Sequence, residues 1–168
     1  MSLVPNEPSF EPGHDLPPRT RVLVAEDDPI SLELICARLK RWGFEAVATR
    51  DGAEAMSALE APDAPTLAIL DWMMPGVDGI EICRAIRASG RSLYIIIVTA
   101  RGSKESIAEG LAAGADDYLV KPFDKDELHV RILVGLRVIA LQATLEERLR
   151  KLDIATAELT DLKQQYSF

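Results

Sequence analysis

Cysteine is scarce in this chain, and long apolar runs are absent from it. Only two cysteines occur among 168 residues, and their separation matches no metal-binding motif. We expect Cys36 and Cys83 to be buried, reduced thiols within helices, as in a cytoplasmic protein. No uninterrupted apolar run approaches the roughly 18 residues that cross a membrane. The N-terminus has no apolar core either, so we expect neither a membrane span nor a signal peptide.

The chain also has fewer positively charged than negatively charged residues. The chain has 19 Lys and Arg against 27 Asp and Glu, which gives a formal net charge of −8. A nucleic-acid-binding surface needs clustered Lys and Arg, so we expect this chain to contact no nucleic acid. The 48% content of hydrophobic residues is sufficient for a packed core, and the length fits one domain with an appendage.

The N-terminal segment, residues 1–19, contains five prolines and no apolar periodicity. This composition predicts a disordered arm.

Four short apolar runs each end in a residue with a chemically functional side chain. The runs lie at 22–25, 67–70, 95–98 and 118–120, and they are followed by Glu26-Asp27, Asp71, Thr99 and Lys121. Helical stretches separate the runs, which is typical of buried parallel strands. Because the carboxyl ends of parallel strands share one edge of a sheet, we expect these side chains to meet in one crevice.

Periodicity and capping residues predict five strands that alternate with five helices. The predicted strands are 21–25, 45–49, 66–70, 94–98 and 117–120, and the predicted helices are 29–42, 52–60, 79–88, 104–113 and one that starts near 124. Asp51 and Asp124 are suitable N-caps. Right-handed crossovers between the strands give an α/β fold with a doubly wound parallel sheet.

The side chains at the strand ends suit phosphoryl chemistry. Crowded carboxylates repel one another and favour a hard divalent cation such as Mg²⁺. Asp71 follows a central strand and is suited to attack phosphorus, which would form an aspartyl phosphate. Lys121 supplies a second cation, and the Thr99 hydroxyl can donate a hydrogen bond to a phosphoryl oxygen.

Four motifs, in order, carry a resemblance to a known family. They are VLVAEDDP at 22–29, DWMMPGVDG at 71–79, VTA at 98–100 and GADDYLVKPF at 114–123. Over residues 21–139 the chain resembles a response regulator receiver domain of bacterial two-component signalling. The resemblance implies a flavodoxin-like fold with strand order 2-1-3-4-5. It also implies a regulatory phosphoacceptor domain, not an enzyme, that receives its phosphoryl group from a sensor histidine kinase or phosphotransfer protein.

The resemblance also implies residue roles. Asp71 is the expected phosphoacceptor, and Lys121 is expected to contact the phosphoryl group. The bond between Lys121 and Pro122 is expected to be cis. Thr99 and Tyr118 are the expected switch residues, which relay the change to the face formed by the fourth helix, fifth strand and fifth helix. The expected Mg²⁺ ligands are Asp27 directly, Glu26 through water, Asp71, and the backbone carbonyl of Met73.

Two other functions fit the residues less well. A phosphatase with an aspartate nucleophile usually has a second carboxylate two residues later, where this chain has Met73. A nucleotide- or flavin-binding module has a glycine- or hydroxyl-rich loop after the first strand, and the acidic residues at 26–28 would repel phosphate there.

The last predicted helix has no stop signal. Residues 124–165 contain no proline and one glycine, and beyond Arg137 apolar residues follow a heptad pattern that Arg148 interrupts. We expect a receiver domain at 20–137 and a coiled-coil signalling helix at 138–168, which pairs with a second copy to form a homodimer. We expect the sequence to be cut before an output domain; the alternative is a stand-alone receiver whose tail binds a partner. His129 in this helix is expected at the surface and not as a phosphodonor.

Overall fold

The structure is a computed structural model that describes residues 20–166. The predicted arm at 1–19 and the last two residues of the predicted coiled coil lie outside the described part. Strands and helices alternate along the chain as follows: β1 (Arg21–Ala25), α1 (Pro29–Arg41), β2 (Glu45–Thr49), α2 (Gly52–Glu60), β3 (Leu67–Asp71), α3 (Gly79–Ala88), β4 (Tyr94–Thr99), α4 (Lys104–Ala112), β5 (Asp117–Val120) and α5 (Lys125–Gln165).

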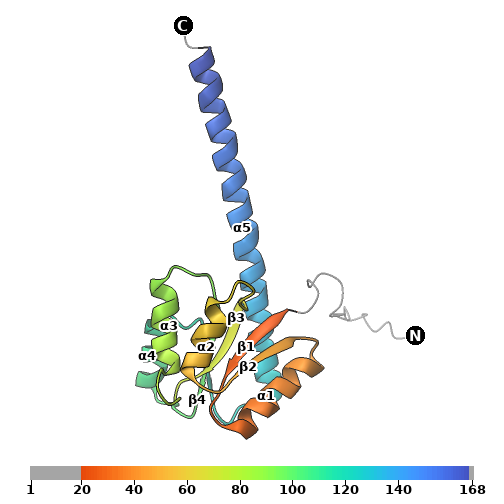
Figure 1. Ribbon diagram of the computed structural model, residues 1–168, viewed down its shortest axis with the longest axis vertical. Helices are drawn as coiled ribbons and strands as arrows, with labels where there is room; N and C mark the ends of the chain where they lie inside the picture. Colours follow the sequence, from red (N-terminus) through yellow and green to blue (C-terminus); the bar gives the residue numbers. More distant parts are fainter. Residues whose placement is uncertain (1–19, 167–168) are drawn as a thin grey trace, which may run out of the picture.

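The five strands form one parallel sheet in the order β2-β1-β3-β4-β5. This confirms the predicted fold class and strand order. Helices α1 and α5 cover one face of the sheet, and α2, α3 and α4 cover the other (Figure 1). The chain order reverses between β1 and β3, which is the point in such a sheet where a crevice opens at the carboxyl ends of the strands.

Alternate residues of the strands supply the two layers of the core. Leu70 and Ile97 face α2 and α3, whereas Ile69 and Ile96 face α1 and α5. The strands are buried on both sides, which explains why they are continuous apolar runs. This burial fixes the register, because a one-residue slip would exchange the two faces.

The helices begin at side-chain caps. Asp28, Asp51 and Asp124 accept hydrogen bonds from the backbone N–H groups of Ser31, Glu54 and Asp126. Asp51 and Asp124 are the predicted caps, and each fixes the direction in which its helix leaves the strand before it.

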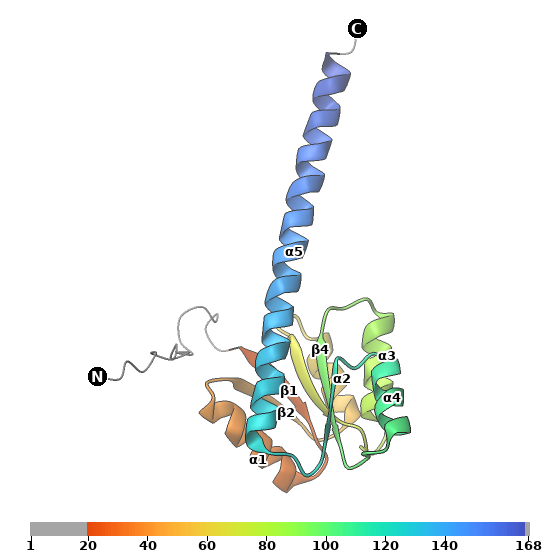
Figure 2. The ribbon, with the colours of Figure 1, turned by 180° about the vertical axis from the view of Figure 1, so that it is seen from behind.

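Helix α5 is 41 residues long and projects far beyond the sheet (Figure 2). Its first turns pack on the sheet through Leu128, Ile132 and Gly135, which are buried. A Cβ atom at Gly135 would lie 2.6 Å from Cδ1 of Tyr94, so the glycine permits the close approach of α5 to β4. From Ala140 to Tyr166 every residue is exposed.

By length and composition α5 also qualifies as a candidate membrane span, with a mean hydropathy of 1.5 over its best 18-residue window. Helices of proteins without any membrane span can meet the same criterion, and 17% of this window is buried against the rest of the domain. The criterion is therefore weak evidence for a membrane span.

His129 differs from its expected position at the surface. It is partly buried, and its ring stacks on that of Trp42 at the end of α1, with ring centroids 4.3 Å apart and planes inclined by 5°. The stack joins α1 to α5 on the face of the sheet that these two helices cover.

Candidate functional site

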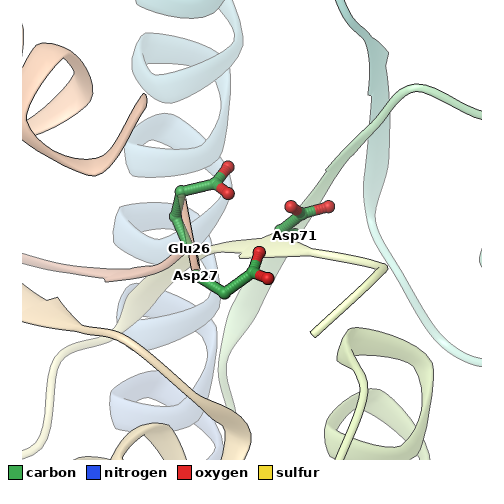
Figure 3. A group of neighbouring side chains, drawn as sticks. All are labelled: Glu26, Asp27 and Asp71. Carbon is green, nitrogen blue, oxygen red and sulfur yellow. The ribbon is translucent and has the colours of Figure 1, made fainter. Parts of the chain in front are cut away.

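Three carboxylates meet at the carboxyl edge of the sheet. Glu26 and Asp27 directly follow β1, and Asp71 is the last residue of β3. Their carboxyl groups gather around one space (Figure 3), and one oxygen from each lies within 4.8 Å of the others. Glu26 and Asp71 are buried, whereas Asp27 is exposed to solvent. The neighbouring strands β1 and β3 therefore bring the predicted acidic cluster together.

Lys121 connects this cluster to β5. Its Nζ atom lies 2.5 Å from Oε2 of Glu26 and 3.2 Å from Oδ2 of Asp71. The bond between Lys121 and Pro122 is cis, as expected. The ammonium group neutralises part of the negative charge that the carboxylates concentrate here.

The pKa values of the ion pair follow from its surroundings. Burial raises the pKa of Glu26 above its ordinary value, although the hydrogen bond from Lys121 opposes that rise. For Lys121, burial lowers the pKa, but the contacts with Glu26 and Asp71 outweigh it and the net pKa is raised. Lys121 therefore carries its charge at neutral pH.

Thr99 and Tyr118 border the same edge. Thr99 ends β4, is fully buried, and its Oγ1 accepts a hydrogen bond of 3.2 Å from the backbone N–H of Arg101. Tyr118 is buried beside Trp72, and its hydroxyl donates a hydrogen bond of 2.6 Å to the carbonyl oxygen of Arg101. The two predicted switch residues therefore contact the same residue, which the sequence analysis did not single out.

The loop after β3 contributes mainly backbone groups. The N–H of Met73 donates a hydrogen bond of 3.2 Å to Oδ1 of Asp71, and the Met73 side chain points to solvent. Nearby acidic residues have structural roles: Asp78 caps α3, and Asp116 accepts a hydrogen bond from the N–H of Ile95.

The donor set fits a hard divalent cation. It consists of carboxylate oxygens, two of them on buried groups and one on an exposed group, and soft ligands such as cysteine are not part of it. Mg²⁺ prefers one or two carboxylates with water completing its coordination, which suits a site open on the side of Asp27.

Two features at this edge were missed by the sequence analysis. Ile30 and Leu34 are large apolar residues on one face of α1, exposed by 76% and 50%. The other is Arg101, whose position two residues after a strand end was the available signal.

Comparison with known proteins identifies the family to which this fold belongs. The family model for the response regulator receiver domain matches residues 22–133. The chain is 44% identical over 117 residues to the uncharacterized transcriptional regulatory protein YrkP of Bacillus subtilis. This alignment covers 70% of this chain and 49% of that protein. It is 43% identical over 117 residues to the response regulator MprA of Mycolicibacterium vanbaalenii, in an alignment that covers 70% of this chain and 50% of that protein.

A solved structure agrees with these sequences. The receiver domain of the Francisella response regulator 1452 superimposes with a TM-score of 0.68 at 35% identity, covering 72% of this chain and 99% of that one. The chain spans about half the length of the curated relatives it matches. The matched residues, 22–133, run from within β1 to the first turns of α5 and so include the acidic residues, Thr99 and Lys121 at the strand ends: the chain belongs to the response regulator receiver domain family of two-component signalling.

Proposed function

We propose that Asp71 is the phosphoacceptor of a signalling switch. The observation that carries this proposal is the position of its buried carboxylate, between two further carboxylates and the Lys121 ammonium at 3.2 Å. A phosphatase would need a second acid where Met73 stands, and a nucleotide-binding loop would not carry Glu26 and Asp27.

The chemistry is a transfer from a phosphodonor to an aspartate oxygen. A lone pair on the Asp71 carboxylate forms the new O–P bond while the P–N bond of a phosphohistidine, or the P–O bond of acetyl phosphate, breaks. Lys121 carries a positive charge within reach of the phosphoryl oxygens and offsets the charge that the transferred group adds. Asp71 itself keeps its position through the N–H of Met73.

Mg²⁺ is the proposed cofactor, held by Asp27, Asp71 and the carbonyl oxygen of Met73, with Glu26 acting through water. When bound, it supplies positive charge between the carboxylates and the phosphoryl oxygens. Glu26 is nearly enclosed and paired with Lys121, whereas Asp27 is exposed. This difference supports the assignment of Asp27, and not Glu26, as the direct ligand of the acidic pair.

Thr99 and Tyr118 are the proposed switch residues. The Thr99 hydroxyl is buried at the end of β4 and can donate to a phosphoryl oxygen while it accepts from the N–H of Arg101. A movement of Thr99 would reach Tyr118 through the loop between β4 and α4, and so alter the face formed by α4, β5 and α5.

The proposed phosphodonor is a sensor histidine kinase or a phosphotransfer protein. Ile30 and Leu34 form an exposed apolar pair one helical turn apart at the start of α1, and they follow the acidic residues directly. A groove of about 350 Å³, lined by residues that include Leu34, Lys121 and Pro122, lies beside them. An apolar pair at the edge of a charged site supports docking of a protein helix that presents a phosphohistidine.

We also propose that the chain forms a homodimer through α5. Exposed apolar residues recur on one side of the helix at intervals of three, four or seven residues: Val130, Val134, Leu141, Leu145, Leu152, Leu159 and Leu162. This stripe is already present on the receiver, on the side of α5 opposite to Leu128 and Ile132. A parallel coiled coil covers the whole stripe, whereas an antiparallel pair centred on the tail would leave Val130 and Val134 exposed.

The phosphoacceptor is tested by intact mass after incubation with acetyl phosphate and Mg²⁺. We expect one added phosphoryl group in the wild type and none in Asp71→Asn, because the amide oxygen is a poor nucleophile. Asp78→Asn is the matched control and is expected to accept the group, since Asp78 only caps α3. A modified Asp71→Asn variant would overturn the assignment.

A further inference from the structure

The loop between β3 and α3, residues 72–78, contains Met73, whose carbonyl oxygen is a proposed Mg²⁺ ligand. The two ends of this loop meet. The N–H of Gly79 donates a hydrogen bond of 3.0 Å to the carbonyl oxygen of Trp72. A Cβ atom at Gly79 would lie 2.4 Å from the carbonyl oxygen of Asp71. The loop is therefore closed at its base, directly beside the proposed phosphoacceptor.

The far side of the same loop contacts the first residue of α2, which is Gly52. This glycine is buried, and a Cβ atom built on it would lie 2.0 Å from the carbonyl oxygen of Val77 and 2.7 Å from its Cβ atom. Any side chain at position 52 would therefore overlap the backbone of the loop. The absence of a side chain is what lets α2 and the loop approach this closely.

The start of α2 is held more firmly than this part of the loop. The side chain of Asp51 caps the helix by accepting a hydrogen bond of 2.8 Å from the N–H of Glu54. One and two turns further on, Ala55 and Leu59 are buried in the core. Residues 75–77 of the loop are exposed to solvent. Where helix and loop would overlap, the loop is therefore the part that moves.

We propose that Gly52 is a positioning residue for the Mg²⁺ site, although α2 supplies none of the proposed ligands. A side chain at this position pushes Val77 away from the helix. Because the base of the loop is closed, the shift falls on residues 73–77, which include Met73. Mg²⁺ requires near-octahedral geometry, so a displaced carbonyl oxygen no longer serves as a ligand. This inference rests on the proposed role of Met73 in binding Mg²⁺.

Gly52→Ala tests the contact by adding one carbon atom. Amide resonances of residues 71–79 are followed while Mg²⁺ is added, and their midpoint gives the dissociation constant. Changes in groups that orient metal ligands typically alter metal affinity by roughly 10- to 100-fold. Water can replace a displaced carbonyl oxygen, so we expect the lower end, a dissociation constant raised by about tenfold. A dissociation constant equal to that of the wild type would overturn the proposal.

Gly135→Ala is the matched control, because it makes the same substitution at another overpacked glycine. The added Cβ atom there would lie 2.6 Å from Cδ1 of Tyr94, between α5 and β4. This variant should bind Mg²⁺ as the wild type does. An equal loss of affinity in both variants would show that overpacking anywhere weakens the site, which would contradict a specific role for Gly52.

The double variant Gly52→Ala/Val77→Gly tests the path through the loop. Glycine at position 77 lets the backbone turn its carbonyl group away from the added methyl group without moving Met73. We therefore expect the double variant to recover most of the lost Mg²⁺ affinity. An affinity as low as that of Gly52→Ala would show that the effect does not pass through Val77.

Phosphorylation separates an effect on the metal from an effect on Asp71. With acetyl phosphate as donor, the Mg²⁺ concentration that gives half the maximal rate should rise in Gly52→Ala by the same factor as the dissociation constant. The rate at saturating Mg²⁺ should stay unchanged, because Asp71 and Lys121 keep their positions. A reduced rate at saturating Mg²⁺, with an unchanged half-maximal concentration, would contradict the proposal.

The wild type provides a test that does not depend on the folding of any variant. The amide resonance of Gly52 should follow added Mg²⁺ with the same midpoint as that of Met73, because the loop connects the two residues. A Gly52 resonance that stays still while Met73 responds would overturn the coupling. If residues 71–79 do not respond to Mg²⁺ at all, the proposed ligand set fails instead, so the two failures are distinguishable.

Discussion

Asp27 and Glu26 are adjacent in sequence but differ in their surroundings. From this difference we predict which of the two carboxylates contacts a bound Mg²⁺ ion directly. Glu26 is buried and paired with Lys121, whereas Asp27 is exposed beside Asp71. A cation that enters from solvent meets Asp27 without first displacing an ammonium group. We therefore expect Glu26 to hold Lys121 and Asp27 to be the residue that a bound metal would contact.

We accordingly expect Asp27→Ala to abolish the response of Trp72 fluorescence to Mg²⁺. The chain has two tryptophans, so the titration is made in a Trp42→Phe background, which keeps an aromatic ring against His129. Asp153→Ala, on the exposed part of α5, should respond as the unmodified background does. An undiminished response in Asp27→Ala would contradict the proposed ligand set.

Cys83 is buried as expected, whereas Cys36 is only partly buried, and this difference predicts different reactivities of the two thiols. Burial raises the pKa of the Cys83 thiol to about 12, and burial also raises that of Cys36. Thiolate is the reactive form, so a raised pKa leaves little of it at pH 8. Native protein treated with iodoacetamide should label Cys83 more slowly than Cys36, and protein in urea should label both rapidly. Equal rates in the native state would contradict the burial of Cys83.

Helix α5 has a first part that packs on the sheet and a second part that is exposed. Its first turns belong to the core of the receiver, and the remainder lies in solvent. The transition follows Ile139, the last residue that packs partly against the core, and earlier in the helix Gly135 lies against Tyr94 of β4. Tyr94 and Leu67 contact this point, so the angle at which α5 leaves the sheet depends on the missing side chain.

We expect Gly135→Ala to destabilise the protein although alanine favours helices. The added Cβ atom would lie 2.6 Å from the ring of Tyr94 and 3.0 Å from Cδ1 of Leu67. Overpacking costs about 1–3 kcal/mol, and the gain in helix propensity offsets only about 1 kcal/mol of it. Urea unfolding at one fixed protein concentration should show a net loss of about 1 kcal/mol. A rise in the free energy of unfolding would show that the helix yields without strain.

The described part of the chain, residues 20–166, is a compact domain from which α5 projects (Figure 1). The projecting part exposes its apolar stripe over its whole length, and Arg148 interrupts the stripe at its centre. Each buried leucine contributes about 1.5–3 kcal/mol, so several per chain offset the cost of association. A charged residue in the seam weakens the pairing, and we expect a dimer of micromolar affinity.

Light scattering on the chain should therefore report a dimer at about 100 µM, well above a micromolar dissociation constant. Leu152→Glu should yield monomers, because it places a charge in the seam. Ala157→Glu, on the opposite side of the helix, should leave the dimer intact. A version that ends at Arg137 should be monomeric. A monomeric wild type, or a dimer that survives the truncation, would contradict pairing through α5.

Local sequence patterns determine the strands, the starts of the helices and the positions of the site residues in this protein. Continuous apolar runs define the strands because parallel strands are buried on both faces, and Asp51 and Asp124 cap their helices through bonds three and two residues away. The site follows from the same pattern. Glu26, Asp71, Thr99 and Lys121 each stand at a strand end, and a parallel sheet gathers its strand ends at one edge.

Only the tertiary structure decides the contacts between distant side chains. Lys121 pairs more closely with Glu26 than with Asp71, His129 stacks on Trp42, and Arg101 joins Thr99 to Tyr118. These contacts depend on helix packing angles and on the rotamers that neighbouring side chains permit. Neither can be predicted from the local periodicity of the sequence. The sequence therefore determines which residues reach the site, whereas packing determines which of them contact one another.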